Sequence, residues 1–346
     1  MNSSGRLSLI CTIFAVKILF AMTRIQFSFL LFSIVFALSP TMAQNKKATK
    51  MQFNALTGFE TFAENSVKHQ SSACYGRFLF LIPDKMSRIT MYDLAKKRII
   101  FTCELTPHLE KCNTTGVLSD ILYHCNESNF GNERYGKDDI FPLLYVSQRN
   151  TLKENRALLS VLRIITFGKD KAHIDSFTVE EVQRIFFPVM TDANGMGTPN
   201  VAIDTEGGYM YPYCRNNRLD APDYLKAVVA KLKLPKLRDS RGNVVKEVFL
   251  ENKDILQSFK MDWNIQAAQG GFVREGKLIL MQGFPNKKPE KNHIWLRVID
   301  LEKQEQTLAK DLVPLGFKWE PEGVFYYKGQ VMTSVNGKGI FVMKFK

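Results

Sequence analysis

The feature that most constrains the fold of this chain is a repeated series of short apolar runs, rich in residues that favour β-strands and separated by turn residues. Two units show the series most clearly. In both, the middle run ends in Asp-Leu before charged residues, which is a natural hairpin turn. Their runs are 76–82, 88–94 and 98–101 in one unit, and 276–281, 294–301 and 306–308 in the other. Each unit therefore predicts three or four short antiparallel strands.

Three partial copies fill the rest of the chain, which brings the number of units to five. Their runs are 141–146, 158–167 and 174–187; 200–204, 208–211, 225–234 and 244–250; and 322–327, 329–333 and 340–345. Repeats of about 40 to 60 residues with three or four strands each are typical of propeller blades, because a blade alone exposes an apolar face that stacking in a ring buries. The last unit is short, and the run 51–62 is predicted to complete it and close the ring.

We therefore expect an all-β fold, a five-bladed β-propeller formed as a single domain by residues 44–346. A β-sandwich or two smaller β domains are the alternatives. The composition fits a packed core, since hydrophobic residues make up 45% of the chain and charged residues 23%. The segment 220–231 stays ambiguous: its Asp-Ala-Pro start suits a helix, whereas the Lys-Leu alternation that follows suits a strand.

Residues 1–43 differ from the rest of the chain, because they hold no Asp or Glu and are rich in Phe, Leu and Ile. The best export signal starts at Met22, with Arg24 as its positive region, the apolar run 25–38, and small residues before a cleavage site after Ala43. That run is shorter than the roughly 20 residues a spanning helix needs, so we expect cleavage rather than a membrane anchor. The sequence therefore predicts a signal peptide, an exported protein in the periplasm or outside the cell, and no stable membrane span after cleavage.

The chain is basic, with a net charge of +13 that falls to +10 without residues 1–43, which contain three basic residues and no acidic ones. Such a balance attracts polyanions. The basic residues are nevertheless spread along the chain, which favours a solvated basic surface over a dedicated polyanion site. Export also argues against a nucleic-acid partner.

Six cysteines are present, and the one at position 11 lies in the leader. The remaining five include no CxxC pair, which gives no support to a zinc-ribbon or thioredoxin-like reading. Cys103 and Cys112 flank a plausible turn, and two alternatives stay open for them: a disulfide across the turn, or buried free thiols.

Several stretches carry a family resemblance: Gln269-Gly270-Gly271-Phe272, Ile299-Asp300-Leu301, Trp319-Glu320-Pro321-Glu322-Gly323-Val324, and His124-Cys125-Asn126 followed by Phe130-Gly131. With the strands around them, they resemble the secreted β-propeller proteins of Bacteroides-type gut bacteria, most of which are uncharacterised. A more distant likeness is to helveticin and teichoic-acid-related propellers. The resemblance covers residues 69–346 and implies the propeller fold, but it brings no established catalytic set.

In a propeller the innermost strands run along a central channel, and loops at one mouth usually form the ligand site. Polar residues at the start of the first strand of each unit are therefore candidate ligand-binding residues. They are His69 and Gln70; His124 and Asn126; Asn200 and Asp204; Gln266 and Gln269; and Trp319, Glu320 and Glu322. The alternative is that these side chains hold water or hydrogen-bond neighbouring blades. Glu322 is the leading single candidate.

Two classes of function fit such a mouth. The first is a binding module for a glycan, a cell-surface component or a partner protein, in which Trp263, Trp295 or Trp319 stacks on sugar rings. The second is a carbohydrate-active hydrolase or lyase whose channel carboxylates, drawn from Glu320, Glu322, Asp204 and Asp262, face each other across a sugar. No Gly-x-Ser-x-Gly elbow, phosphate loop, dinucleotide fingerprint or metal-ligand spacing occurs, so we expect no cofactor and no metal. A carbohydrate-binding propeller is the leading prediction.

Overall fold

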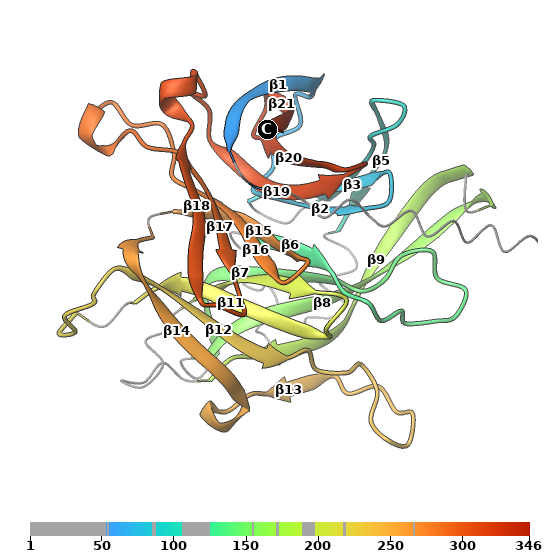
Figure 1. The fold of residues 1–346 in the computed structure, drawn as a ribbon. Helices are drawn as coiled ribbons and strands as arrows, with labels where there is room; N and C mark the ends of the chain where they lie inside the picture. Colours follow the sequence, from blue (N-terminus) through green and yellow to red (C-terminus); the bar gives the residue numbers. More distant parts are fainter. Residues whose placement is uncertain are drawn as a thin grey trace, which may run out of the picture. The chain divides into compact units, whose positions relative to one another are not determined.

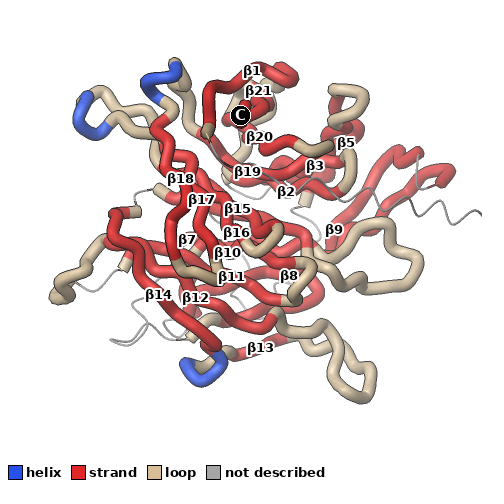
Figure 2. Tube along the Cα trace, viewed as in Figure 1, coloured by secondary structure: helices blue, strands red, loops and turns tan. Residues whose placement is uncertain are grey.

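The computed structural model describes Phe53 and residues 55–84, 88–105, 125–153, 156–170, 173–188, 198–216, 219–265 and 267–346. These residues form five β-sheets arranged as a five-bladed propeller, as the sequence predicts (Figure 1). Strands make up nearly all of the regular structure, and the helices of the described residues are single 3-10 turns (Figure 2). The leader prediction for residues 1–43 falls outside the described part of the chain.

Each blade contains four antiparallel strands, here given from the innermost strand outward, and blade 2 has a fifth, parallel strand at its outer edge. Blade 1 contains β2 (Ser71–Tyr75), β3 (Phe78–Ile82), β4 (Arg88–Asp93) and β5 (Arg98–Glu104). Blade 2 contains β6 (Cys125–Phe130), β7 (Leu144–Lys153), β8 (Arg156–Asp170) and β9 (His173–Phe186). Blade 3 contains β10 (Asn200–Asp204), β11 (Tyr209–Arg215), β12 (Lys226–Lys233) and β14 (Ile255–Asn264). Blade 4 contains β15 (Ala268–Arg274), β16 (Lys277–Gln282), β17 (Trp295–Asp300) and β18 (Glu305–Asp311).

Blade 5 joins the two ends of the described chain. Its strands are β19 (Pro321–Tyr327), β20 (Gln330–Val335), β21 (Gly339–Phe345) and, on the outer edge, β1 (Leu56–Glu64). β1 pairs antiparallel with β21 from Leu56 opposite Phe345 to Glu64 opposite Gly339. The prediction that an early run completes the last unit is confirmed, and the ring is closed by hydrogen bonds between its first and last strands.

The apolar core lies between the blades, as ring stacking requires. Five clusters of buried side chains fill the five gaps between neighbouring blades. Between blades 1 and 2, for example, Phe80 packs edge-on against Phe141 and Phe177, with ring centroids 5.0 and 5.6 Å apart. Burying one such side chain contributes roughly 1.5–3 kcal/mol, so these gaps supply most of the folding free energy.

The inner strands approach one another closely at the axis. A Cβ atom added to Gly323 of β19 would overlap the hydroxyl of Ser72 on β2, and one added to Gly270 would lie 2.9 Å from the Cα of Gly323. Gly270 also has a φ of +102°, a conformation that side chains other than glycine's rarely adopt. These two glycines let the backbones of blades 1, 4 and 5 meet at the channel.

Two strand assignments from the sequence need correction. The run 244–250 was predicted for the third unit, but β13 (Glu247–Phe249) pairs in parallel with β9 of blade 2, and β14 takes the outer position of blade 3. Phe249 stacks on Phe186 with ring centroids 4.6 Å apart, which explains the choice of neighbour. In blades 1, 2 and 4, the inner strand lies before the run that was expected to be the first strand of the unit. The apolar pattern does not reveal these strands, because they consist largely of small and polar residues. In the ambiguous segment 220–231, residues 220–225 form turns and the remainder belongs to strand β12 (Lys226–Lys233).

The part of the chain that the structure describes holds no helix of the length and hydropathy that a membrane crossing requires. Cys103 is buried on β5, and its proposed partner Cys112 lies outside the described residues.

Candidate functional site

The channel has two ends, which we name by the direction of the inner strands: the leading end, where they begin, and the trailing end, where they finish. The predicted residues at the leading end bind one another across blades. The Gln70 amide donates to Glu322 Oε2 at 2.8 Å, and the Gln269 amide donates to Glu320 Oε1 at 2.7 Å. The structure therefore brings four predicted residues from blades 1, 4 and 5 together.

Asn126 and Asn200 continue this belt of polar contacts between blades 2, 3 and 4. The Asn126 amide donates to the side-chain oxygen of Asn200 and, at 3.2 Å, to the carbonyl of Ala268. Both asparagines are buried. Contacts between blades at this end match the structural alternative raised from the sequence, in which polar side chains hold neighbouring blades together. His124 and Gln266 lie outside the described residues.

Glu322 is the most perturbed carboxyl group at the leading end. Only 1% of the residue is exposed, and burial raises the pKa of Glu322 to about 10, helped by the charge of Glu320 and opposed by a hydrogen bond from Asn336. The Glu322 carboxyl group is therefore protonated at neutral pH, and it accepts the hydrogen bond from Gln70 as a neutral acid. His69 is also neutral, because burial lowers the pKa of its ring to about 4.

Other candidates lie away from this belt. Asp204 is the last residue of β10, at the opposite end from Asn200, and it accepts hydrogen bonds from the backbone N–H groups of Glu206 and Gly207 in the following turn. Trp319 packs in the core between blades 4 and 5, stacked on Phe341 at a centroid distance of 5.0 Å. Neither side chain is therefore placed to join the predicted mouth.

The remaining sequence candidates also lie elsewhere. Asp262 sits on β14, the outer strand of blade 3, and forms a 2.9 Å ion pair with Lys226. Trp263 and Trp295 both contact the guanidinium of Arg297, whose carbon lies 4.1 and 4.7 Å from the two ring centroids. Asp262 and Asp204 thus cannot form a carboxylate pair with Glu320 or Glu322 around the channel. Within the described residues, no group of three His, Cys, Asp or Glu side chains is arranged to hold a metal ion.

A cavity opens at the trailing end of the channel. Its volume is about 340 Å³, and residues from all five inner strands line it, with further side chains from the loop after β6. Its polar and aromatic lining includes Tyr75, Asn129, Asn132, Arg134, Arg274 and Tyr326. The cavity and the predicted mouth therefore occupy opposite ends of the same channel.

Two arginines supply the only charged side chains among the residues that the structure places around the cavity. Arg134 donates from Nη2 to the hydroxyl of Tyr75 at 2.7 Å. The guanidinium carbon of Arg274 lies 4.0 Å from the centre of the Tyr326 ring, and its Nε lies 3.5 Å from the carboxylate of the adjacent Glu275. Each guanidinium is therefore oriented by a tyrosine from a neighbouring blade, in a cationic cavity.

The floor of the cavity rests on a buried polar cluster. The Asn129 amide donates to the carbonyls of Val201 and Gly271 and to Glu127 Oε1, at 3.0–3.1 Å. Glu127 also accepts the backbone N–H of Gly271 at 2.7 Å. Burial raises the pKa of Glu127 to about 8, so its charge is largely suppressed at neutral pH. The cluster fixes the Asn129 side chain without placing a strong negative charge beneath the two arginines.

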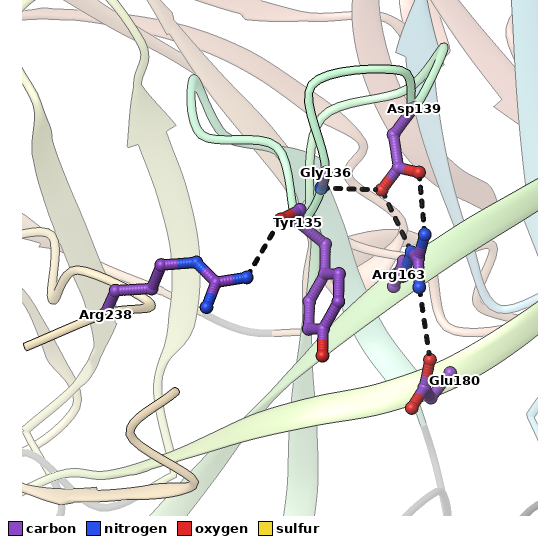
Figure 3. A network of polar contacts seen from close by, with 6 residues as sticks. All are labelled: Tyr135, Gly136, Asp139, Arg163, Glu180 and Arg238. Atoms are coloured by element: carbon purple, nitrogen blue, oxygen red, sulfur yellow. Dashed lines mark hydrogen bonds and ion pairs between the residues drawn. The ribbon is translucent and has the colours of Figure 1, made fainter. Parts of the chain in front are cut away.

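The loop between β6 and β7 forms one side of the cavity and carries Arg134. Its next residue, Tyr135, lies between two other arginines, which Figure 3 shows on either side of the ring. The guanidinium carbons of Arg163 and Arg238 lie 4.4 and 5.3 Å from the ring centre, and Arg238 also donates to the Tyr135 carbonyl at 3.2 Å. Arg163 is itself fixed by a bidentate pair with Asp139 at 2.9 and 3.0 Å. We call these contacts the Tyr135 clamp.

The same loop is also held by hydrogen bonds made by the two residues that precede Arg134. The Asn132 amide donates to the carbonyl of Thr205 at 3.2 Å, and the carboxylate of Glu133 accepts the backbone N–H of Leu237 at 2.9 Å. With the Tyr135 clamp, these bonds hold the loop against two blades, so that the backbone of Arg134 is held in place although its side chain is exposed.

Replacing Tyr135 with leucine is expected to lower the free energy of unfolding by about 1–2 kcal/mol, because two cation–π contacts of about 0.5–1 kcal/mol each are lost. Tyr135→Phe keeps the ring and serves as the matched control, with a change below about 0.5 kcal/mol. Urea unfolding followed by tryptophan fluorescence measures both. Equal destabilisation by the two substitutions would show that the hydroxyl group, and not the ring, holds the loop.

No protein-family model matches this chain, and no curated protein matches it. Among solved structures, the chain is similar to Kuenenia stuttgartiensis hydrazine synthase at 12% identity and a TM-score of 0.39, over 79% of this chain. The match spans 64% of the hydrazine synthase chain. It is also similar to the computationally designed protein Ika8 at 6% identity and a TM-score of 0.30, over 86% of this chain and 100% of the other.

Sequence reasoning missed the cavity residues, although a signal for them exists. Tyr75, Arg274 and Tyr326 each come one to three residues before the glycine of the hairpin that follows an inner strand, at positions 76, 276 and 329. Aligning the units on those glycines, rather than on the apolar runs, would have brought these three side chains to one end of the ring. The loop residues Asn132 and Arg134 carry no comparable repeat signal.

Proposed function

We propose that this protein is an exported, ligand-binding β-propeller whose binding site is the cavity at the trailing end of the channel, and that its ligand is a carbohydrate. The observation that carries the proposal is a cavity of about 340 Å³ on the channel axis, lined from all five inner strands. Its size lies in the range of small-molecule sites, which extends from about 300 to 1,000 Å³. A sugar unit or a disaccharide suits that space.

The lining combines the two kinds of group that sugars need. Tyr75 and Tyr326 offer aromatic rings, and Asn132 offers an amide at the side of the cavity. Aromatic rings bind the apolar faces of sugars, while amides pair with the hydroxyl groups around the ring edge. Polar groups of the protein that reach the cavity from several blades can fix the orientation of a bound ligand. Such a site binds its ligand and does not need to react with it.

Binding is favoured over catalysis because glycoside hydrolysis requires two carboxyl groups that flank the scissile bond. Residues of the described chain that line the cavity include no Asp or Glu. At the leading end, Glu320 and Glu322 are engaged by Gln269 and Gln70, and Glu322 is almost fully buried. Neither end of the channel therefore presents two carboxylates that could flank a scissile bond, as the hydrolase or lyase alternative requires.

The proposal is tested by measuring carbohydrate binding to the purified protein with a glycan panel and calorimetry, and by blocking the cavity. Thr205 lines the cavity and is exposed, so Thr205→Trp places a large ring at its edge without disturbing the core. Thr61→Trp, at an exposed position on β1, is the matched control. We expect a ligand from the panel to bind the parent protein and Thr61→Trp equally, and Thr205→Trp at least about tenfold more weakly. Equal affinities for all three proteins would place the binding site elsewhere.

A further inference from the structure

Resting on the proposed carbohydrate site, we propose that the ligand is an acidic sugar, a uronate, whose carboxylate is bound by Arg134 and Arg274. The two side chains come from different blades and line the same cavity. The inference goes beyond carbohydrate binding because it assigns a negative charge to the ligand and names the two residues that bind the charged group.

The first observation is the charge balance of the cavity. Arg134 and Arg274 are the only charged side chains that the structure places along its lining, and both are positive. Arg274 already has one acidic neighbour, the carboxylate of Glu275 at 3.5 Å from its Nε, but Glu275 does not line the cavity, and a neutral sugar adds no negative charge there. A carboxylate does, and arginine and carboxylate form charge-assisted hydrogen bonds about twice as strong as neutral ones.

The second observation is the orientation of the two guanidinium groups. A guanidinium carries five N–H donors in a planar fork, and Arg134 gives one of them to the Tyr75 hydroxyl at 2.7 Å. Arg274 lies over the Tyr326 ring at 4.0 Å, which sets the plane of its fork. Arginines held in this way lose less side-chain freedom when they bind a planar carboxylate, so the site is built for that group.

The third observation concerns the loop that carries Arg134. The Tyr135 clamp and the bonds of Asn132 and Glu133 fix the backbone on both sides of this residue. A solvated surface arginine needs no such support. The loop therefore presents Arg134 to the cavity from a fixed backbone position.

The charge of the whole chain acts in the same direction. The net charge is +10 without residues 1–43, so an acidic sugar is attracted to the protein from a distance, and that attraction weakens as salt is added. The spread of the basic residues along the sequence favours a solvated basic surface over a dedicated polyanion site. Under the present proposal, two of these residues at the trailing end of the channel bind an anionic ligand.

The experiment compares sugars that differ only at C6: methyl glucoside with methyl glucuronide, and methyl galactoside with methyl galacturonide. Calorimetry on the full mature chain is expected to show at least one uronate that binds about tenfold or more tightly than its neutral partner. That preference should shrink as salt is raised. Arg134→Gln and Arg274→Gln should each reduce the ratio towards one, whereas Arg241→Gln, at an exposed turn residue, should leave it unchanged.

The outcomes separate this inference from the proposed function. If neutral sugars bind as tightly as their uronates, the inference fails and carbohydrate binding stands. If no sugar of either kind binds, the proposed function fails as well. If the ratio of uronate affinity to neutral-sugar affinity is unchanged in both glutamine variants, the assignment of the two arginines is also wrong. Melting temperatures of the variants, which should stay within a few degrees of the parent value, exclude unfolding as the reason for a loss.

Discussion

A chain that begins at Ser66 is expected to lose the folded propeller, because it lacks the strand that closes the ring. β1 pairs with β21 along the whole of its length and contributes buried Leu56 and Ala63 to the clusters on either side of blade 5. Phe59 adds edge-on contacts to Phe317, Trp319 and Phe341 at centroid distances of 5.1–6.3 Å. Each large apolar side chain that loses its burial costs roughly 1.5–3 kcal/mol, so the loss of several at once is a large fraction of the 5–15 kcal/mol that stabilises a typical domain.

The measurement is thermal unfolding followed by circular dichroism, with a chain that begins at Met51 as the matched control. Residues 51–346 form one compact unit that includes β1, so the control should melt cooperatively. The chain from Ser66 should show no cooperative transition, and a synthetic peptide of residues 51–65 added in trans should restore one. A shift of only a few degrees in the chain from Ser66 would mean that the ring does not depend on its closing strand.

Replacing Glu322 with glutamine is expected to stabilise the protein at neutral and alkaline pH. The pKa of Glu322 is about 10 in the folded state and near 4.5 when the group is exposed. Between these values the folded state binds more protons than the unfolded one, so this group's contribution to stability is complete below about pH 4.5 and falls as the pH rises towards 10. The slope of that loss is at most about 1.4 kcal/mol per pH unit.

Glutamine has nearly the shape of the protonated acid, and its carbonyl can accept the Gln70 hydrogen bond that Glu322 accepts. The substitution therefore removes the titration while it keeps the contact. Urea unfolding between pH 5 and pH 9 should show the parent protein losing stability with pH and Glu322→Gln losing less, by about 2–3 kcal/mol at pH 7. A slope from Glu127, whose pKa is about 8, should remain in both proteins.

Two results would contradict this account of Glu322. An unchanged pH dependence in Glu322→Gln would mean that the carboxyl group is ionised in the folded protein. A loss of sugar affinity with unchanged stability would return the binding site to the leading end of the channel. The cavity lies at the other end, so we expect affinity to stay within about twofold of the parent value.

Much of the fold could be predicted from the residues, because blade formation depends on local signals. The apolar runs and their turns predict most of the outer strands, and the Asp-Leu endings mark hairpins that the structure contains after β4 and β17. The short last unit predicted its completion by an early strand, which pairs with β21. The inner strands were placed less well, since strands such as Ser71–Tyr75 and Ala268–Arg274 contain small and polar residues where an apolar run was expected.

The leading-end residues show how much of a site can be predicted from a repeated sequence pattern. Recurrence in each unit predicted that His124, Asn126, Gln269 and Glu322 would converge at one mouth. His124 lies outside the described residues, and the other three each contact a polar side chain of another blade at the leading end. Recurrence does not reveal whether converged polar groups bind one another or an external ligand. That depends on distances across the channel, which follow from the close approach of β2, β15 and β19 at their glycines.

By itself, the sequence determined the class of fold, the number of blades and the closing strand, because hydrophobic period and turn chemistry act over a few residues. Only the tertiary structure decided which end of the channel holds a cavity. Polar residues at both ends contact neighbouring blades, but the leading-end side chains hydrogen-bond one another, whereas those at the trailing end line a cavity. The contacts that bring Arg134 and Arg274 to one cavity join blades 2 and 4, about 140 residues apart in the chain. Only closure of the ring fixes such contacts, because no interaction between neighbouring residues specifies them.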